Sequence, residues 1–256
     1  MQTRDATSKP VAAPGSVNAR FIDLLGIGQR MPWVDLVRSV RLEDCGPVRS
    51  FPVRSGRRMA PGWWWSATDG RLVRYGSGVM RTQVMLLDHD PEVVAVACRP
   101  VEFVWREPDG SCLEHAPHLM ARLDDGSGLL VDCAGREEVS RRLAHRAEVV
   151  AAAVASVGWR YRIARPPDPV LAANLSWLAG YRHPRYRGGA LAGRVTEAFQ
   201  RSRPLMEGVR GLGDPVGVLP VVFHALWNGA LSAPLDTPLH ERVTVTAART
   251  VGRRQA

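Results

Sequence analysis

Hydrophobic residues recur along this chain with two spacings, and each spacing predicts a different kind of element. A helical spacing runs through residues 77–87, where apolar side chains return every three or four positions. The longer helical pattern covers residues 137–157 and ends before Gly158. Its predicted buried face consists of Val139, Leu143, Ala147, Val150 and Val154.

Short β-type runs fill the space between these two helices. They cover residues 93–98, 101–105, 111–115, 118–123 and 129–133. Turn residues separate them, as at Pro108-Asp109-Gly110 and Asp124-Asp125-Gly126. Asp69-Gly70 predicts a hairpin before the first helix, and residues 161–163 predict one more strand after the second. The pattern therefore predicts an α/β fold.

A proline-rich segment at residues 166–169 divides the pattern into two parts. We expect an N-terminal tail and lead-in over 1–48 and an α/β domain over 49–165. Residues 166–256 are expected to form a small winged-helix-like α+β domain. Its elements are predicted as helices near 170–180, 190–200, 205–212 and 214–227, then short strands near 230–235 and 242–247.

Composition and charge narrow the class of protein. The 256 residues carry a formal net charge of +9, almost entirely from arginine, because Lys9 is the only lysine. Such a balance suits a nucleic-acid or acidic-protein partner. The four cysteines have no zinc-ligand spacing and are expected to be reduced thiols. The longest apolar stretch, 149–157, is too short to span a bilayer, so we expect a cytoplasmic protein without a membrane partner.

Three motifs in the α/β part carry a more specific signal. They are Tyr75-Gly76-Ser77, His115-Ala116-Pro117-His118 and Leu130-Val131-Asp132-Cys133-Ala134. In this order they resemble the endonuclease subunit of heteromeric transposases, the TnsA-like family. The resemblance implies a PD-(D/E)xK restriction-endonuclease-like core followed by a winged-helix-like domain.

The resemblance also implies where catalytic groups should stand. Family members carry a Glu at the position of Gly76, an Asp at that of His118 and a basic residue at that of Ala134, whereas Asp132 alone is retained here. Cleavage of DNA by this fold needs carboxylates that hold one or two divalent ions. We therefore assign no catalytic residue from the sequence and expect no cofactor.

Two alternatives remain in which this region still binds a metal ion or cleaves DNA. A transition metal could bind to His115, His118, Asp132 and Cys112, although the spacing of the two histidines on an extended chain predicts opposite faces. Alternatively, Asp132 could work with migrated groups on the following helix, where Arg136, Glu137 and Glu138 stand. In that case the protein would be an active endonuclease that uses Mg²⁺ or Mn²⁺.

Two arginine clusters are candidates for DNA-backbone binding. The first is Arg54, Arg57 and Arg58, which precede three consecutive tryptophans at 63–65, and the second is Arg182, Arg185 and Arg187. The apolar helix that ends at Trp227 offers only His224 and Asn228 to read a base edge, so we expect the C-terminal domain to dock on protein.

The resulting hypothesis is a catalytically degenerate TnsA-like subunit. It would bind the DNA backbone and dock on a DDE transposase subunit and an AAA+ regulator ATPase, which are the partners that the resemblance implies. The alternatives are the active endonuclease described above and an interaction protein that acts outside transposition.

Overall fold

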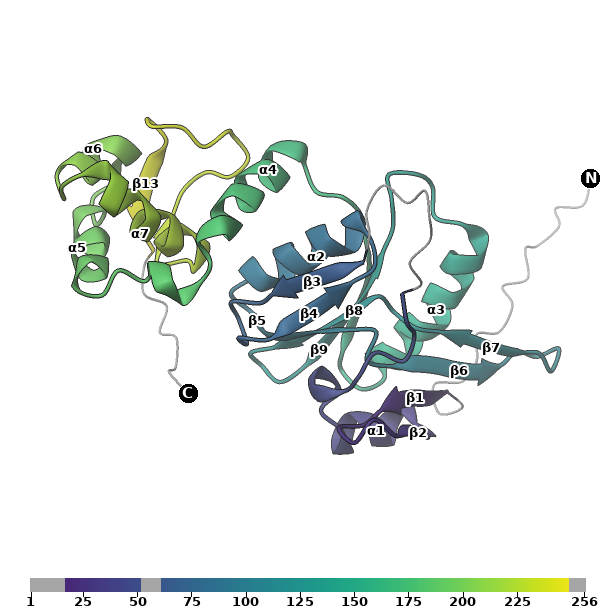
Figure 1. The fold of residues 1–256 in the computed structure, drawn as a ribbon. Helices are drawn as coiled ribbons and strands as arrows, with labels where there is room; N and C mark the ends of the chain where they lie inside the picture. The colour runs from purple at the N-terminus through teal and green to yellow at the C-terminus, as the bar shows by residue number, and fades with distance from the viewer. Residues whose placement is uncertain (1–16, 52–60, 249–256) are drawn as a thin grey trace, which may run out of the picture. The chain divides into compact units, whose positions relative to one another are not determined.

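The computed structural model describes residues 17–51 and 61–248, and it divides the chain into two compact units (Figure 1). Unit 1 consists of Met1–Trp63, Val73–Arg81 and Val94–Arg165. Unit 2 consists of Trp64–Leu72, Thr82–Val93 and Pro166–Ala256. The main border thus falls at the prolines of the predicted linker, and two earlier segments also belong to unit 2.

Two four-stranded sheets form the framework of unit 1. The first has the order β2-β1-β6-β7, and all its strand pairs are antiparallel. Its strands are β1 (Asn18–Ile22), β2 (Gly28–Pro32), β6 (Glu102–Arg106) and β7 (Cys112–His115). The second has the order β10-β9-β8-β5, with β8 antiparallel and β10 parallel to β9. Its strands are β5 (Val93–Cys98), β8 (Leu119–Leu123), β9 (Gly128–Cys133) and β10 (Arg160–Ala164).

These elements confirm an α/β fold, with strand positions close to those predicted from the sequence. The hairpin of β3 (Gly62–Trp65) and β4 (Leu72–Tyr75) turns at Asp69-Gly70, where Gly70 has a φ of 69° that favours glycine. Helix α2 (Gly78–His89) follows it and ends just before Asp90-Pro91, as predicted.

The segment over residues 17–48 contains more regular structure than the predicted lead-in. It forms β1, β2, α1 (Trp33–Ser39) and the 3₁₀ helix η2 (Leu42–Asp44). Leu24 and Leu25 are 80% and 83% exposed at the tip of the β1–β2 hairpin. Apolar residue type does not bury them, because Asp23 accepts hydrogen bonds from the backbone of Leu25 and Ile27, which fixes a solvent-facing turn.

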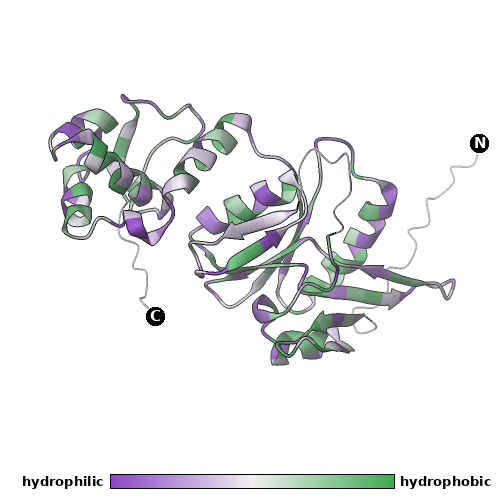
Figure 2. Ribbon diagram, in the orientation of Figure 1, coloured by the Kyte–Doolittle hydropathy of each residue, from purple (hydrophilic) through white to green (hydrophobic). Residues whose placement is uncertain are grey.

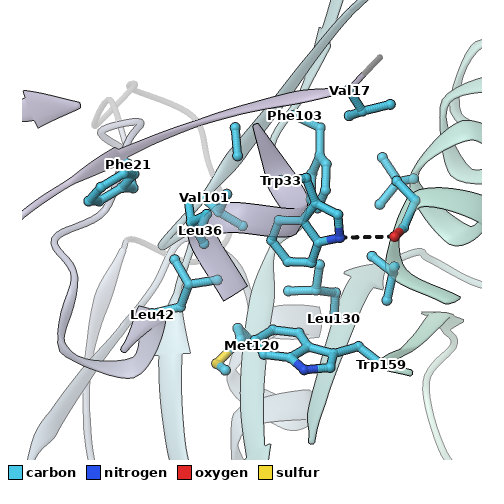
Figure 3. Close-up of a cluster of buried hydrophobic side chains, with 14 of the residues drawn as sticks. Val17, Phe21, Trp33, Leu36, Leu42, Val101, Phe103, Met120, Leu130 and Trp159 are labelled. Atoms are coloured by element: carbon cyan, nitrogen blue, oxygen red, sulfur yellow. Dashed lines mark hydrogen bonds between the residues drawn. The ribbon is translucent and has the colours of Figure 1, made fainter. Parts of the chain in front are cut away.

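Trp33 is the central side chain of this segment (Figure 3). It is completely buried, and its ring lies 4.7 Å from that of Phe103 and 5.5 Å from that of Trp159. Its Nε1–H donates to the carbonyl of Ala153 at 2.9 Å. One residue therefore joins α1 to β6 and to the long helix of unit 1.

That long helix, α3 (Arg141–Ala155), begins later than the sequence pattern predicts. Ser140 is its N-cap and accepts from the backbone N–H of Leu143, so Glu137 and Glu138 lie in the preceding coil. The prediction that these acids open the helix was wrong because a serine three residues on offers a better cap. Hydrophilic and hydrophobic residues alternate along α3 in Figure 2, and the apolar ones include the buried Val150 and Val154.

Unit 2 is mainly helical in its C-terminal part, as predicted. It contains α4 (Pro169–Leu178), η3 (Ala179–Tyr181), η4 (Pro184–Tyr186), α5 (Ala190–Ala198), α6 (Leu205–Arg210) and α7 (Pro215–Trp227). Asp214 caps α7 and Pro215 occupies its first turn. A three-stranded sheet has the order β11-β13-β12, formed by β11 (Arg203–Pro204), β12 (Leu231–Ser232) and β13 (Thr244–Ala247). Among the residues described, no helix combines the length and apolar content needed to cross a bilayer.

Asp88, near the end of α2, accepts hydrogen bonds from residues 64–68, which also belong to unit 2. This buried carboxylate accepts from Trp64 Nε1 at 2.8 Å, Ser66 Oγ at 2.7 Å and Thr68 N at 3.0 Å. A buried charge is stabilised when hydrogen bonds of this kind satisfy its oxygens. Trp64 is therefore a structural residue of unit 2 and is not available for stacking on a base.

Candidate functional site

Asp132 lies on β9 at the place where the two sheets of unit 1 meet, and its side chain is completely buried. Its Oδ2 accepts from the hydroxyl of Tyr161, on the parallel neighbour β10, at 2.5 Å. Tyr161 is paired with Leu130, two residues before Asp132, so both side chains point to the same face of the sheet. Nε2 of His115, at the end of β7, lies 2.5 Å from the same oxygen.

His118 approaches the other carboxylate oxygen of Asp132. Its Nδ1 lies 2.8 Å from Oδ1, but this nitrogen already accepts the backbone N–H of Cys133 at 3.0 Å. Oδ1 consequently has no hydrogen-bond partner within the part of the chain that is described, despite the short distance.

The convergence of the two histidines corrects the sequence prediction. An uninterrupted strand would place His115 and His118 on opposite faces, but Ala116 and Pro117 carry the chain from one sheet to the other. Each imidazole then reaches a different oxygen of Asp132. Spacing alone gives the wrong answer here because the strand does not continue through the motif.

These contacts keep Asp132 ionised inside the protein. Burial opposes its ionisation, but His115, followed by His118, outweighs burial and holds the pKa of this carboxyl well below its ordinary value. Burial and the charge of Asp132 together raise the pKa of Tyr161 far above its usual range. Tyr161 therefore remains a neutral donor, and the network is a closed, structurally satisfied group around Oδ2.

Gly76, where the resemblance would place the first carboxylate, has no room for a side chain. It lies directly after β4 and is buried, and a Cβ built on it would lie 2.1 Å from Cδ1 of Phe51. The Phe51 ring thus fills the space into which a side chain at position 76 would extend. A carboxylate could enter only if Phe51 moved away.

This packing gives a testable prediction for Gly76→Ala. We expect the variant to lose about 1–3 kcal/mol of unfolding free energy, because overpacking forces Phe51 from its position. Denaturation with urea measures the loss, and Phe51→Ala in the same background should recover part of it. Gly135→Ala is the matched control, since a Cβ there meets nothing within 4 Å. Equal stability of the Gly76 and Gly135 variants would contradict the prediction.

The remaining positions of the motif do not rebuild a nuclease centre. Ala134 follows the end of β9 and uses its backbone N–H to donate to Ala164. Arg136, Glu137 and Glu138 are exposed in the coil after β9, whereas Asp132 is sealed. The alternative with migrated groups therefore lacks an accessible carboxylate at Asp132.

Of the proposed transition-metal ligands, His115, His118 and Asp132 lie together, but Cys112 lies apart from them. Cys112 is exposed at the opposite end of β7 from His115. In the regions covered by the structure, no group of three or more His, Cys, Asp or Glu side chains is arranged to hold a metal ion. Burial raises the pKa of Cys98 and that of Cys133 to about 12, so both thiols stay protonated.

The candidate DNA-binding arginines have different surroundings. Arg54, Arg57 and Arg58 lie outside the described residues. Arg182 stacks on Trp64 at 4.1 Å and donates to the carbonyl of Trp65 at 2.9 Å, which commits it to the interior of unit 2. Arg185 and Arg187 are exposed, and Arg185 also donates to the Tyr186 hydroxyl.

Three residues around the site were not selected from the sequence. Tyr161 gave no signal beyond its strand, and Phe51 stands alone beside a basic run. Arg99 lies between β5 and β6 and has a φ of 46°, a conformation that sequence reasoning would assign to glycine. Only the tertiary structure identifies these three residues.

No protein-family model matches the chain, and no curated protein matches it either.

Proposed function

We propose that this protein is a catalytically degenerate PD-(D/E)xK protein, similar to TnsA-like transposase subunits, that binds the DNA backbone without cutting it. The proposal relies on one observation above all. The retained acid, Asp132, is fully buried among His115, His118 and Tyr161. A divalent ion that activates water needs accessible oxygen ligands, and this arrangement offers none at Asp132.

The order of elements supports the choice of fold. Helix α2 comes first, the strands β5, β8 and β9 are neighbours in one sheet although β6 and β7 of the other sheet come between β5 and β8 along the chain, and α3 leads to β10 beside β9. This is the order of helix, strand meander, helix and strand that the resemblance implies. The filled position at Gly76 supports the same fold without its activity, because a ring replaces the first metal ligand.

The distribution of charge supports DNA as the partner. Unit 1 contains 22 of the basic residues and 15 of the acidic ones, whereas unit 2 contains 12 and 10. Most of the excess positive charge therefore belongs to the unit with the closed nuclease-like site. Phosphate contacts of this kind give salt-dependent affinity with little sequence preference.

For unit 2 we propose a docking role on a winged-helix-like scaffold. Helix α7 is buried from Val221 to Trp227. His224 donates through Nδ1 to the carbonyl of Tyr181 at 2.8 Å, so its ring is not free to read a base. The partners that the resemblance suggests are a DDE transposase subunit and an AAA+ ATPase.

Two measurements on the full chain test the proposal. With supercoiled plasmid and either Mg²⁺ or Mn²⁺, we expect no metal-dependent nicking above the level of an Asp132→Asn variant. With a fluorescent DNA duplex, we expect binding that weakens steeply as salt rises. Nicking that requires metal and disappears in Asp132→Asn would establish an active endonuclease instead. A chain that does not bind DNA at low salt would refute the DNA-binding role.

A further inference from the structure

Arg99 has an unusual backbone that fixes its side chain beside the closed site. It is the one non-glycine residue with positive φ among those described, and residues that carry a side chain rarely adopt this backbone conformation. Two hydrogen bonds hold it there: its N–H donates to the carbonyl of His118 at 3.1 Å, and its carbonyl accepts from Val48 at 2.9 Å. Strained residues of this kind cluster at functional sites.

The guanidinium of Arg99 forms no ion pair within the described chain, although the charge of the buried Asp132 acts on it. It lies 4.1 Å from the centroid of the Phe51 ring, and its Nε is buried without a hydrogen-bond acceptor. Neighbouring arginines are different, because Arg49 pairs with Glu102 and Glu114 and Arg122 pairs with Glu43. Burial is the main cause that lowers the pKa of Arg99, so an incoming anion would stabilise its charge.

A second arginine shares the same aromatic ring. The Arg74 guanidinium lies 5.9 Å from the Phe51 centroid and 5.1 Å from that of the exposed Trp63. Arg74 likewise has no carboxylate partner among the residues that the structure covers. An anion bound near both guanidinium groups would be attracted by each of them.

We infer that Arg74 and Arg99 together bind one phosphate of the DNA backbone. Phe51, which fills the space beside Gly76, is the platform on which the two guanidinium groups lie. Guanidinium groups hold phosphate through paired N–H donors and cannot activate water. Fixed arginine charge thus takes over the phosphate-binding role that a metal ion has in a cleaving nuclease. This inference depends on the proposed DNA binding.

The test compares charge-neutralising variants by fluorescence anisotropy with a labelled duplex at several salt concentrations. We expect Arg74→Gln and Arg99→Gln each to weaken binding roughly 3- to 10-fold. The double variant should lower the magnitude of the salt slope by about 1, as for the loss of one phosphate contact. Arg106→Gln, at the far end of β6, removes the same charge from an exposed position and is the control.

The outcomes distinguish failure of the proposed phosphate site from failure of the proposed DNA binding. If the unmodified chain does not bind DNA, the proposed function itself fails. If it binds but the Arg74 and Arg99 variants match Arg106→Gln in affinity and slope, the phosphate site is refuted. Arg74→Gln decides the question if Arg99→Gln unfolds, because Arg74 has ordinary backbone geometry. Thermal unfolding followed by circular dichroism identifies any such loss of folding.

Discussion

Asp132→Ala is expected to lose about 3–5 kcal/mol of unfolding free energy, the range found when one member of a buried charged group is removed. The substitution leaves His115 and Tyr161 without the acceptor that both contact at 2.5 Å. It also opens a cavity in a position that is fully buried. Chemical denaturation followed by far-ultraviolet circular dichroism measures the loss.

Acid titration adds a second readout for Asp132. Because the folded-state pKa is below the unfolded one, the carboxylate contributes stability above about pH 4, and this contribution disappears as the pH falls through the lowered pKa. The advantage of the native chain over Asp132→Asn should therefore shrink below pH 4. Glu137→Ala, in exposed coil, is the control and should leave stability nearly unchanged. A fully stable Asp132→Ala variant would contradict the closed network.

Trp33→Ala is expected to lower the free energy of unfolding by a similar amount, about 3–5 kcal/mol, as other large-to-small changes of a buried aromatic residue do. The variant removes the contacts with Phe103 and Trp159 and the hydrogen bond to Ala153. Urea denaturation measured by circular dichroism gives the value without relying on tryptophan fluorescence. Trp33→Phe should lose less, because it keeps an aromatic ring.

The control for Trp33 is another tryptophan of the same unit. Trp63 is 59% exposed, so Trp63→Ala should change stability far less. If Trp33→Ala were as mild as Trp63→Ala, the segment before residue 49 would not be part of the core of unit 1. The predicted contrast therefore tests whether this segment is integral to the fold.

The hydrogen-bonded network around Asp132 and the position of Gly76, which Phe51 covers, have the same consequence for function. At both positions the space is filled by contacts that protein groups make to one another, where the proposed function would place open carboxylates in an active relative. Such replacements stabilise a fold but remove the ligands that a metal ion needs. In the proposed function, therefore, the nuclease-like unit contributes binding and positioning, and any cleavage comes from a partner.

The sequence by itself determined most elements of secondary structure. Periodic apolar residues and local turn chemistry predict β5, α2 and the capped helix α7, because these signals depend only on neighbours along the chain. That Gly76 and Ala134 carry no carboxylate or basic group is also visible from residue type alone. The late start of α3 was missed because two acids, Glu137 and Glu138, precede Ser140, which is the better N-cap.

Only the tertiary structure decided the state of the site. His115 and His118 converge on Asp132 because the chain passes from one sheet to another between them, which no spacing rule contains. Phe51 occupies the space beside Gly76, and Trp33 joins a distant helix, through contacts between residues far apart in sequence. Local patterns fix the direction of a side chain within one element, whereas the packing of elements fixes what that side chain meets.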